Sequence, residues 1–262
     1  MTLSDPSVPA DMWADESLPS VAIESPVPPA ASVFVEADTA VRERYAARWV
    51  AAALDAVIQR RNRAVLGLVG GSSVAGVHRT LLDVDVDWSR VIITQADERA
   101  VPADSPERNW RVIEPLVDPL LADGRLPAAN VQSLVDLPSD TTPEMLETAL
   151  APLRTAVDRI DVALLGLGPD GHVASLFPHH ACLGTAGSFQ VVTDSPKPPP
   201  LRMSATVSML AGADATAVVG FGDGKAEAVA AITSTGPLAD APGRIVHLAG
   251  RGVIVTDRIP AT

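Results

Sequence analysis

Asp170 and His172 stand together in a glycine-rich turn, and a carboxylate beside an imidazole can move a proton. The turn follows Val162 to Leu165, a short apolar run typical of a strand covered on both faces. In open α/β sheets, ligands bind beyond the carboxyl ends of the strands, which is where this turn would lie. The alternative is an ordinary Asp-Gly turn with a structural histidine.

A second glycine-rich segment, Gly70-Gly71-Ser72-Ser73, lies between an apolar run and a short helix expected to end near Leu82. Backbone N–H groups at the start of that helix, together with the serine hydroxyls, would face an incoming anion. The segment has neither the Gly-Lys-Ser/Thr ending of a Walker loop nor the dinucleotide pattern G-x-G-x-x-G. A phosphate cradle and a plain tight turn therefore both remain open.

Charged residues follow other expected strands. Asp97-Glu98-Arg99 comes after the strand expected over Val91 to Gln95, and Arg108-Asn109-Trp110 follows shortly after, with a solvated loop as the alternative. Gly222-Asp223-Gly224-Lys225 joins a strand to a helix, where the helix dipole disfavours a lysine unless an anion is bound. Arg202 follows three prolines and points either into the same crevice or into water.

The elements that must position these residues alternate between strand and helix. Strands are expected at residues 32–36, 64–69, 91–95, 162–165, 190–193, 205–207 and 217–221. Helices are expected over 41–57 with Asp38 as N-cap, from Ser73 to Leu82, over 110–117 with Pro115 as a kink or end, over 143–156, from Ala174 onward, and over 225–232. Residues 245–249 and 253–256 resemble a closing hairpin. The alternation predicts an α/β fold with a doubly wound, mostly parallel sheet flanked by helices.

The chain divides into an extension and one domain. Residues 1–31 are acidic and rich in proline, without a sustained period, and indicate a flexible extension or a surface strap. Residues 32–262 contain no linker, so we expect a single α/β domain. The apolar content of 47% is ample for its core.

Composition limits the partners and the compartment. The formal charge of −12 argues against broad nucleic-acid binding, which needs a basic surface, but leaves room for a small anion held by local cations. No apolar stretch is long enough to cross a membrane, and the N-terminus begins with acidic residues. Cys182 is the single cysteine and is interpreted as a spectator thiol. We therefore expect a cytoplasmic protein, as a monomer or small homo-oligomer.

Taken in this order, the segments resemble the 6-phosphogluconolactonase family, within the superfamily of glucosamine-6-phosphate deaminase and ribose-5-phosphate isomerase. The resemblance covers roughly residues 32–258. Its most specific parts are Gly166-Leu-Gly-Pro-Asp-Gly-His-Val-Ala-Ser-Leu-Phe-Pro178 and Asp97-Glu-Arg-Ala-Val-Pro102, supported by Arg202-Met-Ser-Ala-Thr206 and Gly222-Asp-Gly-Lys225. Ser73-Val74 stands where the family usually has Thr-Pro, and Arg108 stands where a serine is common.

The resemblance implies a sheet of the deaminase/isomerase type and hydrolysis of 6-phospho-D-glucono-1,5-lactone to 6-phosphogluconate in the pentose phosphate pathway, with no metal and no cofactor. It implies that His172 acts as the base and that Asp170 orients it. Substrate and phosphate binding fall to Gly70, Gly71, Ser72, Ser73, Asp97, Arg99, Asn109, Gly171, Arg202 and Lys225.

Two rival functions remain. A sugar-phosphate isomerase or deaminase would use the same scaffold, although the Ser-Leu-Phe-Pro ending at Pro178 separates lactonases from deaminases. A sugar-phosphate-binding regulator without catalysis is the other rival. The negative charge and the lack of a recognisable helix-turn-helix count against it.

Overall fold

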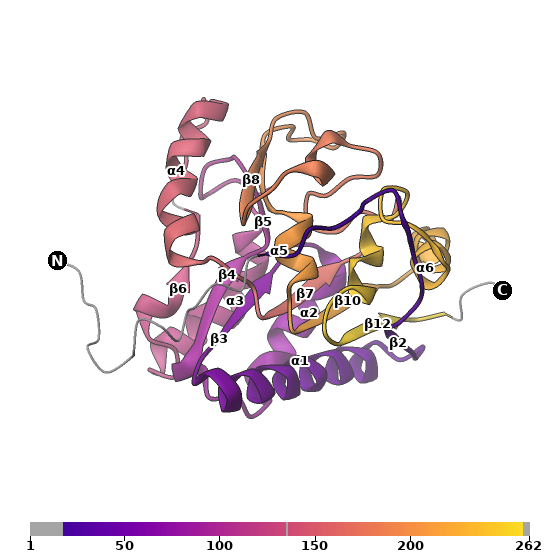
Figure 1. The fold of residues 1–262 in the computed structure, drawn as a ribbon. Helices are drawn as coiled ribbons and strands as arrows, with labels where there is room; N and C mark the ends of the chain where they lie inside the picture. The colour runs from indigo at the N-terminus through magenta and orange to yellow at the C-terminus, as the bar shows by residue number, and fades with distance from the viewer. Residues whose placement is uncertain (1–17, 135, 259–262) are drawn as a thin grey trace.

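The computed structural model describes residues 18–134 and 136–258. Its centre is a seven-stranded sheet in the order β2-β12-β10-β7-β3-β4-β6, in which every neighbouring pair is parallel (Figure 1). The strands are β2 (Ser32–Val35), β3 (Ala64–Leu68), β4 (Val91–Gln95), β6 (Val131–Gln132), β7 (Val162–Gly166), β10 (Ala215–Gly220) and β12 (Gly252–Thr256). This confirms the predicted doubly wound α/β fold.

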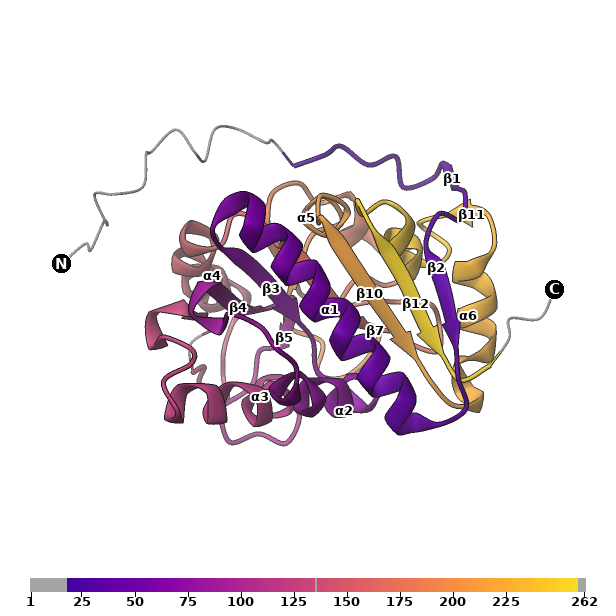
Figure 2. The ribbon, with the colours of Figure 1, turned by 90° about the horizontal axis from the view of Figure 1, so that it is seen from below.

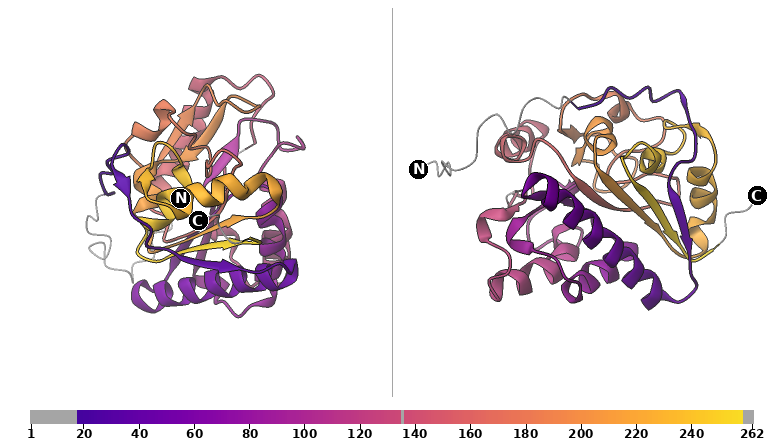
Figure 3. Two further views of the ribbon diagram at one scale, coloured as in Figure 1. Left: turned by 90° about the vertical axis from the view of Figure 1, so that its right-hand side faces the viewer. Right: turned by 60° about the horizontal axis from the view of Figure 1, so that its bottom comes forward.

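Helices cover both faces of this sheet, which is why the central strands are continuous apolar runs. The long helix α1 (Thr39–Arg61) crosses one face diagonally (Figure 2). In Figure 3 (left), α6 (Ala226–Thr233) lies on the opposite side of the sheet from α1. The remaining α-helices are α2 (Ser72–Thr80), α3 (Trp110–Ala122), α4 (Pro143–Ala156) and α5 (Val207–Ala211). β3 and β10 are buried along their whole length as a result.

A second, antiparallel sheet corrects part of the sequence prediction. It has the order β5-β9-β8 and consists of β5 (Asp97–Arg99), β8 (Phe189–Val192) and β9 (Arg202–Ala205). The solvated loop considered for Asp97-Glu98-Arg99 is thus wrong, since Asp97 and Glu98 are buried in a strand. The strand predicted over 205–207 is also misplaced, because Thr206 caps α5 and ends the extended stretch.

The predicted closing hairpin is wrong. Residues Pro242–His247 form a 3-10 helix, η7, and β12 runs parallel to both β2 and β10. The two apolar runs look alike in sequence, but Pro242 fixes a helical φ at the start of the first. The Gly250-Arg251-Gly252 turn therefore leads into a central strand instead of joining two hairpin partners.

Helix α3 continues beyond the point where Pro115 was expected to kink or end it, and it also contains Pro119. Each proline removes one helical hydrogen bond, at a cost of about 3 kcal/mol. Ile113, Leu116 and Leu120 are fully buried on the same helix, and each such burial stabilises it by about 1.5–3 kcal/mol. Packing of the apolar face therefore outweighs the local preference to stop.

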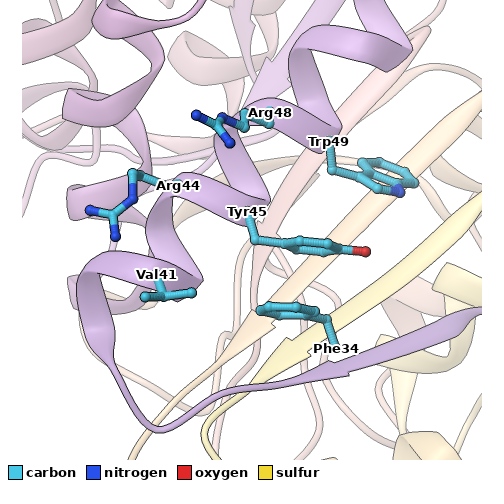
Figure 4. A pocket seen from close by; sticks show the side chains of 6 residues that line it. All are labelled: Phe34, Val41, Arg44, Tyr45, Arg48 and Trp49. Carbon is cyan, nitrogen blue, oxygen red and sulfur yellow. The ribbon is translucent and has the colours of Figure 1, made fainter.

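Helix α1 begins at the predicted N-cap, where the Asp38 side chain accepts a hydrogen bond from the Val41 N–H. The aromatic side chains of α1, however, lie at the edge of the core. Tyr45 stacks on Phe34 of the edge strand β2 with ring centroids 3.6 Å apart, and Trp49 lies on the other side of Tyr45 (Figure 4). These rings, Val41 and two arginines line a hollow of about 410 Å³ that contains no candidate base or nucleophile.

Residues 18–31 pack against the domain. β1 (Pro26–Val27) pairs antiparallel with β11 (Gly236–Pro237), and the Nδ1 atom of His247 accepts hydrogen bonds from the N–H groups of Ala30 and Ala31. The first 17 residues of the predicted extension lie outside the described residues. Within residues 18–134 and 136–258, none of the helices has the length and apolar character needed to span a bilayer.

Candidate active site

The predicted residues meet at one cavity of about 160 Å³, close to the ends of β3, β5 and β7. It is smaller than the aromatic hollow beside α1, but it gathers the imidazole, the two glycine-rich turns and three cations. Its lining consists of Val69, Gly70, Gly71, Ser72, Ser73, Asp97, Arg99, Asn109, Gly166, Leu167, Gly168, His172, Ala174, Arg202 and Lys225. The chemistry of the lining, and not the volume, identifies this cavity as the candidate active site.

The double-glycine turn forms one wall, and both glycines are required there. A side chain on Gly70 would place its Cβ only 2.1 Å from the Oδ1 atom of Asn109, so the backbone can approach Asn109 only without one. Gly71 is the N-cap of α2 and adopts φ of +113°, which favours glycine. The start of α2, with Ser72 and Ser73, thus lines the cavity, and the free N–H groups of a helix start can bind an anion.

The turn after β7 presents His172. Gly168 donates its N–H to the carbonyl of His172 at 2.8 Å, and a Cβ on Gly168 would lie 1.9 Å from the imidazole Nδ1 atom. Gly171 adopts φ of +85° and closes the turn, but it does not line the cavity. The helix predicted from Ala174 is absent, because Ala174 has φ of +50° and a bridge joins Val173 to Leu176 in a second tight turn.

His172 is held by Asp170 through its Nδ1 atom, 2.5 Å from the Asp170 Oδ1 atom. With a neutral imidazole, Nδ1–H donates to the carboxylate, which leaves Nε2 as the proton acceptor. Partial burial disfavours the Asp170 anion, but hydrogen bonds and charge from His172 and Lys197 outweigh it and hold the pKa of Asp170 well below its usual range. Asp170 therefore orients the ring as a carboxylate, from a position outside the cavity lining.

Asp97 and Asn109 form a buried network beneath the cavity. Asn109 donates from Nδ2 to the Asp97 Oδ1 atom at 2.8 Å, and the Ser175 hydroxyl donates to Asp97 Oδ2, also at 2.8 Å. Both carboxylate oxygens are thus engaged by protein donors. Asp97 lines the cavity as predicted, and its main interaction is to fix Asn109 against Gly70.

Glu98 is a site residue that sequence reasoning did not identify. It is fully buried, and its carboxylate accepts hydrogen bonds from the N–H groups of Arg99, Asn109 and Trp110 at 2.7–2.8 Å. Burial raises the pKa of Glu98 to about 6, although these N–H donors counteract the shift. Because Trp110 begins α3, Glu98 ties the start of that helix to the strand that carries Arg99.

Two cations that line the cavity, Arg99 and Lys225, have hydrogen-bond donors without a partner among the described residues. The Nε atom of Arg99 is buried without a hydrogen-bond partner among the described residues, while its Nη1 donates to the carbonyl of Glu107. The Lys225 ammonium makes no hydrogen bond or ion pair with a described residue, and burial, followed by the charge of Lys197, lowers its pKa. Buried donors without partners are costly, so an anion that accepts from both would be favoured.

Arg202 lines the cavity, but most of its donors are engaged elsewhere. Its guanidinium donates to the carbonyls of Lys197, Pro198 and Pro199 at 2.9–3.0 Å, and it lies 5.6 Å from the centre of the Phe177 ring. Burial lowers the pKa of Arg202, and the negative charge of Asp97 opposes that shift. The main effect of Arg202 is to hold the loop that precedes β9.

Arg108 lies outside the cavity. Its guanidinium donates to the carbonyls of Val101 and Leu134, so Arg108 does not contribute to the lining. Lys197 was also not identified from the sequence, although it contacts both Asp170 and His172. The available signal was its rarity, since Lys197 and Lys225 are the two lysines of the chain.

Comparison with known proteins identifies the family of the chain. The model of the glucosamine-6-phosphate isomerases/6-phosphogluconolactonase family matches residues 37–255. A 6-phosphogluconolactonase of Mycobacterium leprae is 33% identical over 81% of this chain and 90% of its own length, and one of Streptomyces coelicolor is 36% identical over 77% and 84%. The crystal structure of a 6-phosphogluconolactonase from Shewanella baltica superposes with a TM-score of 0.72 at 25% identity, covering 87% of this chain and 97% of the other. The chain belongs to the glucosamine-6-phosphate isomerase/6-phosphogluconolactonase family.

Proposed function

We propose that this chain, a hydrolase of carbohydrate metabolism, opens 6-phospho-D-glucono-1,5-lactone to 6-phosphogluconate by attack of water that His172 activates. The observation that carries the proposal is the cavity itself, in which an oriented imidazole shares one lining with an anion-binding turn and two cations with unused donors. A lactone with a phosphoryl group at its far end needs both parts at once.

In the proposed reaction, Nε2 of neutral His172 accepts a proton from water as the water oxygen bonds to the lactone carbonyl carbon. The tetrahedral species then collapses, the bond from that carbon to the ring oxygen breaks, and the imidazolium returns its proton to the departing oxygen. Asp170 stays ionised and stabilises the imidazolium between the two transfers. A positioned base contributes about 10²–10⁴-fold, and the reaction needs no covalent intermediate.

Phosphate binding is proposed at the double-glycine turn. The N–H groups of Gly70 and Gly71 and the hydroxyls of Ser72 and Ser73 donate hydrogen bonds to the phosphoryl oxygens, together with the Arg99 and Lys225 cations. Arg202 contributes its charge, while its donors hold the loop. Binding there also fixes the distance from the lactone carbonyl to His172, so loss of a cation impairs both KM and kcat.

The setting of the reaction is also proposed. We expect a cytoplasmic enzyme, because a chain whose single cysteine is Cys182 cannot form an internal disulfide, as suits a reducing compartment. The net charge of −12 favours a small-molecule substrate held by local cations over a nucleic acid. A monomer or small homo-oligomer is expected.

Acid release measured at constant pH after adding protein to the phosphorylated lactone tests the proposal. Acceleration well above the rate in buffer supports it. If the protein binds the sugar phosphate and leaves the rate in buffer unchanged, the non-catalytic regulator is the better description. Conversion of a sugar-phosphate aldose to a ketose, or ammonia release from an amino-sugar phosphate, would favour an isomerase or a deaminase.

A further inference from the structure

Lys197 lies on the side of His172 that faces away from the proposed reaction. Its Nζ atom is 3.1 Å from each oxygen of Asp170 and 3.2 Å from Nδ1 of His172, yet Lys197 is not among the residues that line the cavity. The ammonium has no lone pair and Nδ1–H already donates to Asp170, so the contact with the ring is electrostatic. Lys197 therefore sits close to the proposed base without facing the substrate.

The position of Lys197 is determined by the loop that carries it. The Ser195 hydroxyl donates to the Lys197 carbonyl and accepts from its N–H, and Arg202 donates to the same carbonyl at 2.9 Å. Three prolines follow, each with a fixed φ. Arg202 is buried and gives most of its donors to carbonyls of this loop. These hydrogen bonds fix the loop and so hold the Lys197 side chain in one place.

We propose that Lys197 is a positioning residue that neutralises Asp170 and thereby keeps His172 in its neutral, proton-accepting form at neutral pH. An isolated carboxylate 2.5 Å from Nδ1 would orient the ring but would also favour the imidazolium, which cannot accept a proton. A cation on the same carboxylate removes most of that bias and preserves the orientation. This inference rests on the proposed function.

Other charged groups near His172 have different roles. Asp170 comes from the same turn, Lys225 from the 3-10 turn before α6, and Asp97, Arg99 and Arg202 from the small antiparallel sheet. The proposed phosphate compensates the cavity cations when substrate is bound. Asp97 is engaged by Asn109 and Ser175. Among the described residues, Lys197 is the cation that contacts an imidazole nitrogen of His172, and it lies outside the lining that a bound substrate would touch.

Lys197→Met tests this role through the pH dependence of kcat at saturating phosphorylated lactone, which reports the His172 base while the phosphate of the substrate compensates the cavity cations. The acidic limb is the fall in activity at low pH as His172 becomes protonated. Loss of a unit charge about 3 Å from the ring moves this limb to a higher pH by about one unit, so activity at pH values below the limb falls about tenfold. On the alkaline plateau, kcat should stay within about threefold and KM within about twofold, because Lys197 does not line the cavity. Lys197→Arg keeps the charge and should keep the limb within about 0.3 pH units.

Lys225→Met is the matched control, because it removes the other lysine of the chain. It should raise KM without the shift of about one pH unit that is expected for the acidic limb of Lys197→Met. A limb for Lys197→Met that coincides with the wild-type limb overturns the inference, as does a large rise in KM alone, which would make Lys197 a substrate contact. Either result requires an active wild-type enzyme and so leaves the proposed function standing. A wild-type protein without lactonase activity would instead refute the proposed function.

Discussion

At the scale of single residues, His172 and Lys225 line one cavity, the first as the proposed base and the second as a proposed phosphate ligand. Sequence reasoning identified both, because a histidine two residues after an aspartate and a lysine at a helix start are unusual in local chemical terms. It missed Lys197 and Glu98. Lys197 reaches His172 through a loop 25 residues away, and Glu98 reaches the start of α3 across an irregular segment, so neither contact follows a helix or strand period.

Replacing His172 with Asn should lower kcat by at least about two orders of magnitude and leave KM nearly unchanged, because the base is lost while the anion-binding wall remains. Steady-state kinetics with the phosphorylated lactone measures the effect, and far-UV circular dichroism checks the fold. Turnover within about threefold of wild type would remove His172 from the role of base.

Replacing Lys225 with Met should raise KM for the phosphorylated lactone about 10- to 100-fold, since a charge-assisted hydrogen bond to phosphate is lost. The unphosphorylated lactone provides the internal control, because it has no group for Lys225 to bind. Equal losses on the two substrates would show that the Lys225 ammonium does not contact phosphate.

At the scale of elements, glycines decide how closely the turns approach the side chains they serve. The pattern of apolar runs predicted most strands of the parallel sheet, since those strands are short and buried. It failed for Asp97–Arg99 and for residues 242–247. The first is a strand of charged residues paired to a distant segment, and the second is an apolar run that coils instead of extending.

Replacing Gly70 with Ala tests the close approach directly. The new methyl group would lie 2.1 Å from Asn109 Oδ1, so Asn109 and the double-glycine turn must separate, and kcat/KM should fall at least about tenfold. Gly184→Ala is the matched control, because no atom lies within 4 Å of its added Cβ and its activity should match wild type. Equal activities of the two variants would contradict the proposed geometry.

At the scale of the whole molecule, one titratable group links the packing of α2 and α3 to acid stability. His78 on α2 is fully buried, its Nδ1–H donates to the Val112 carbonyl on α3, and burial lowers its pKa from 6.5 to about 4. The pKa of His78 is lower in the folded state than in the unfolded state. The stabilising contribution of His78 to the free energy of unfolding is therefore fully present above pH 6.5 and is lost as the pH falls toward 4. The free energy of unfolding of the whole domain should therefore decrease in acid.

Denaturant unfolding of wild type and His78→Gln at pH 7.5 and pH 5 measures this decrease. The wild-type free energy of unfolding should drop by about 2 kcal/mol more than that of the variant between the two values, and comparing the two proteins cancels the contributions of other groups such as Glu98. Parallel losses in the two proteins would mean that His78 does not titrate in this range.

A crystal structure of the protein with bound 6-phosphogluconate tests whether His172 and the Gly70–Ser73 turn serve the same substrate. The phosphoryl group should lie against the Gly70–Ser73 turn, within hydrogen-bond distance of Arg99 and Lys225. The carboxylate of the opened lactone should lie within hydrogen-bond distance of Nε2 of His172. A product bound outside this cavity, or bound with its phosphoryl group against His172, would contradict the account.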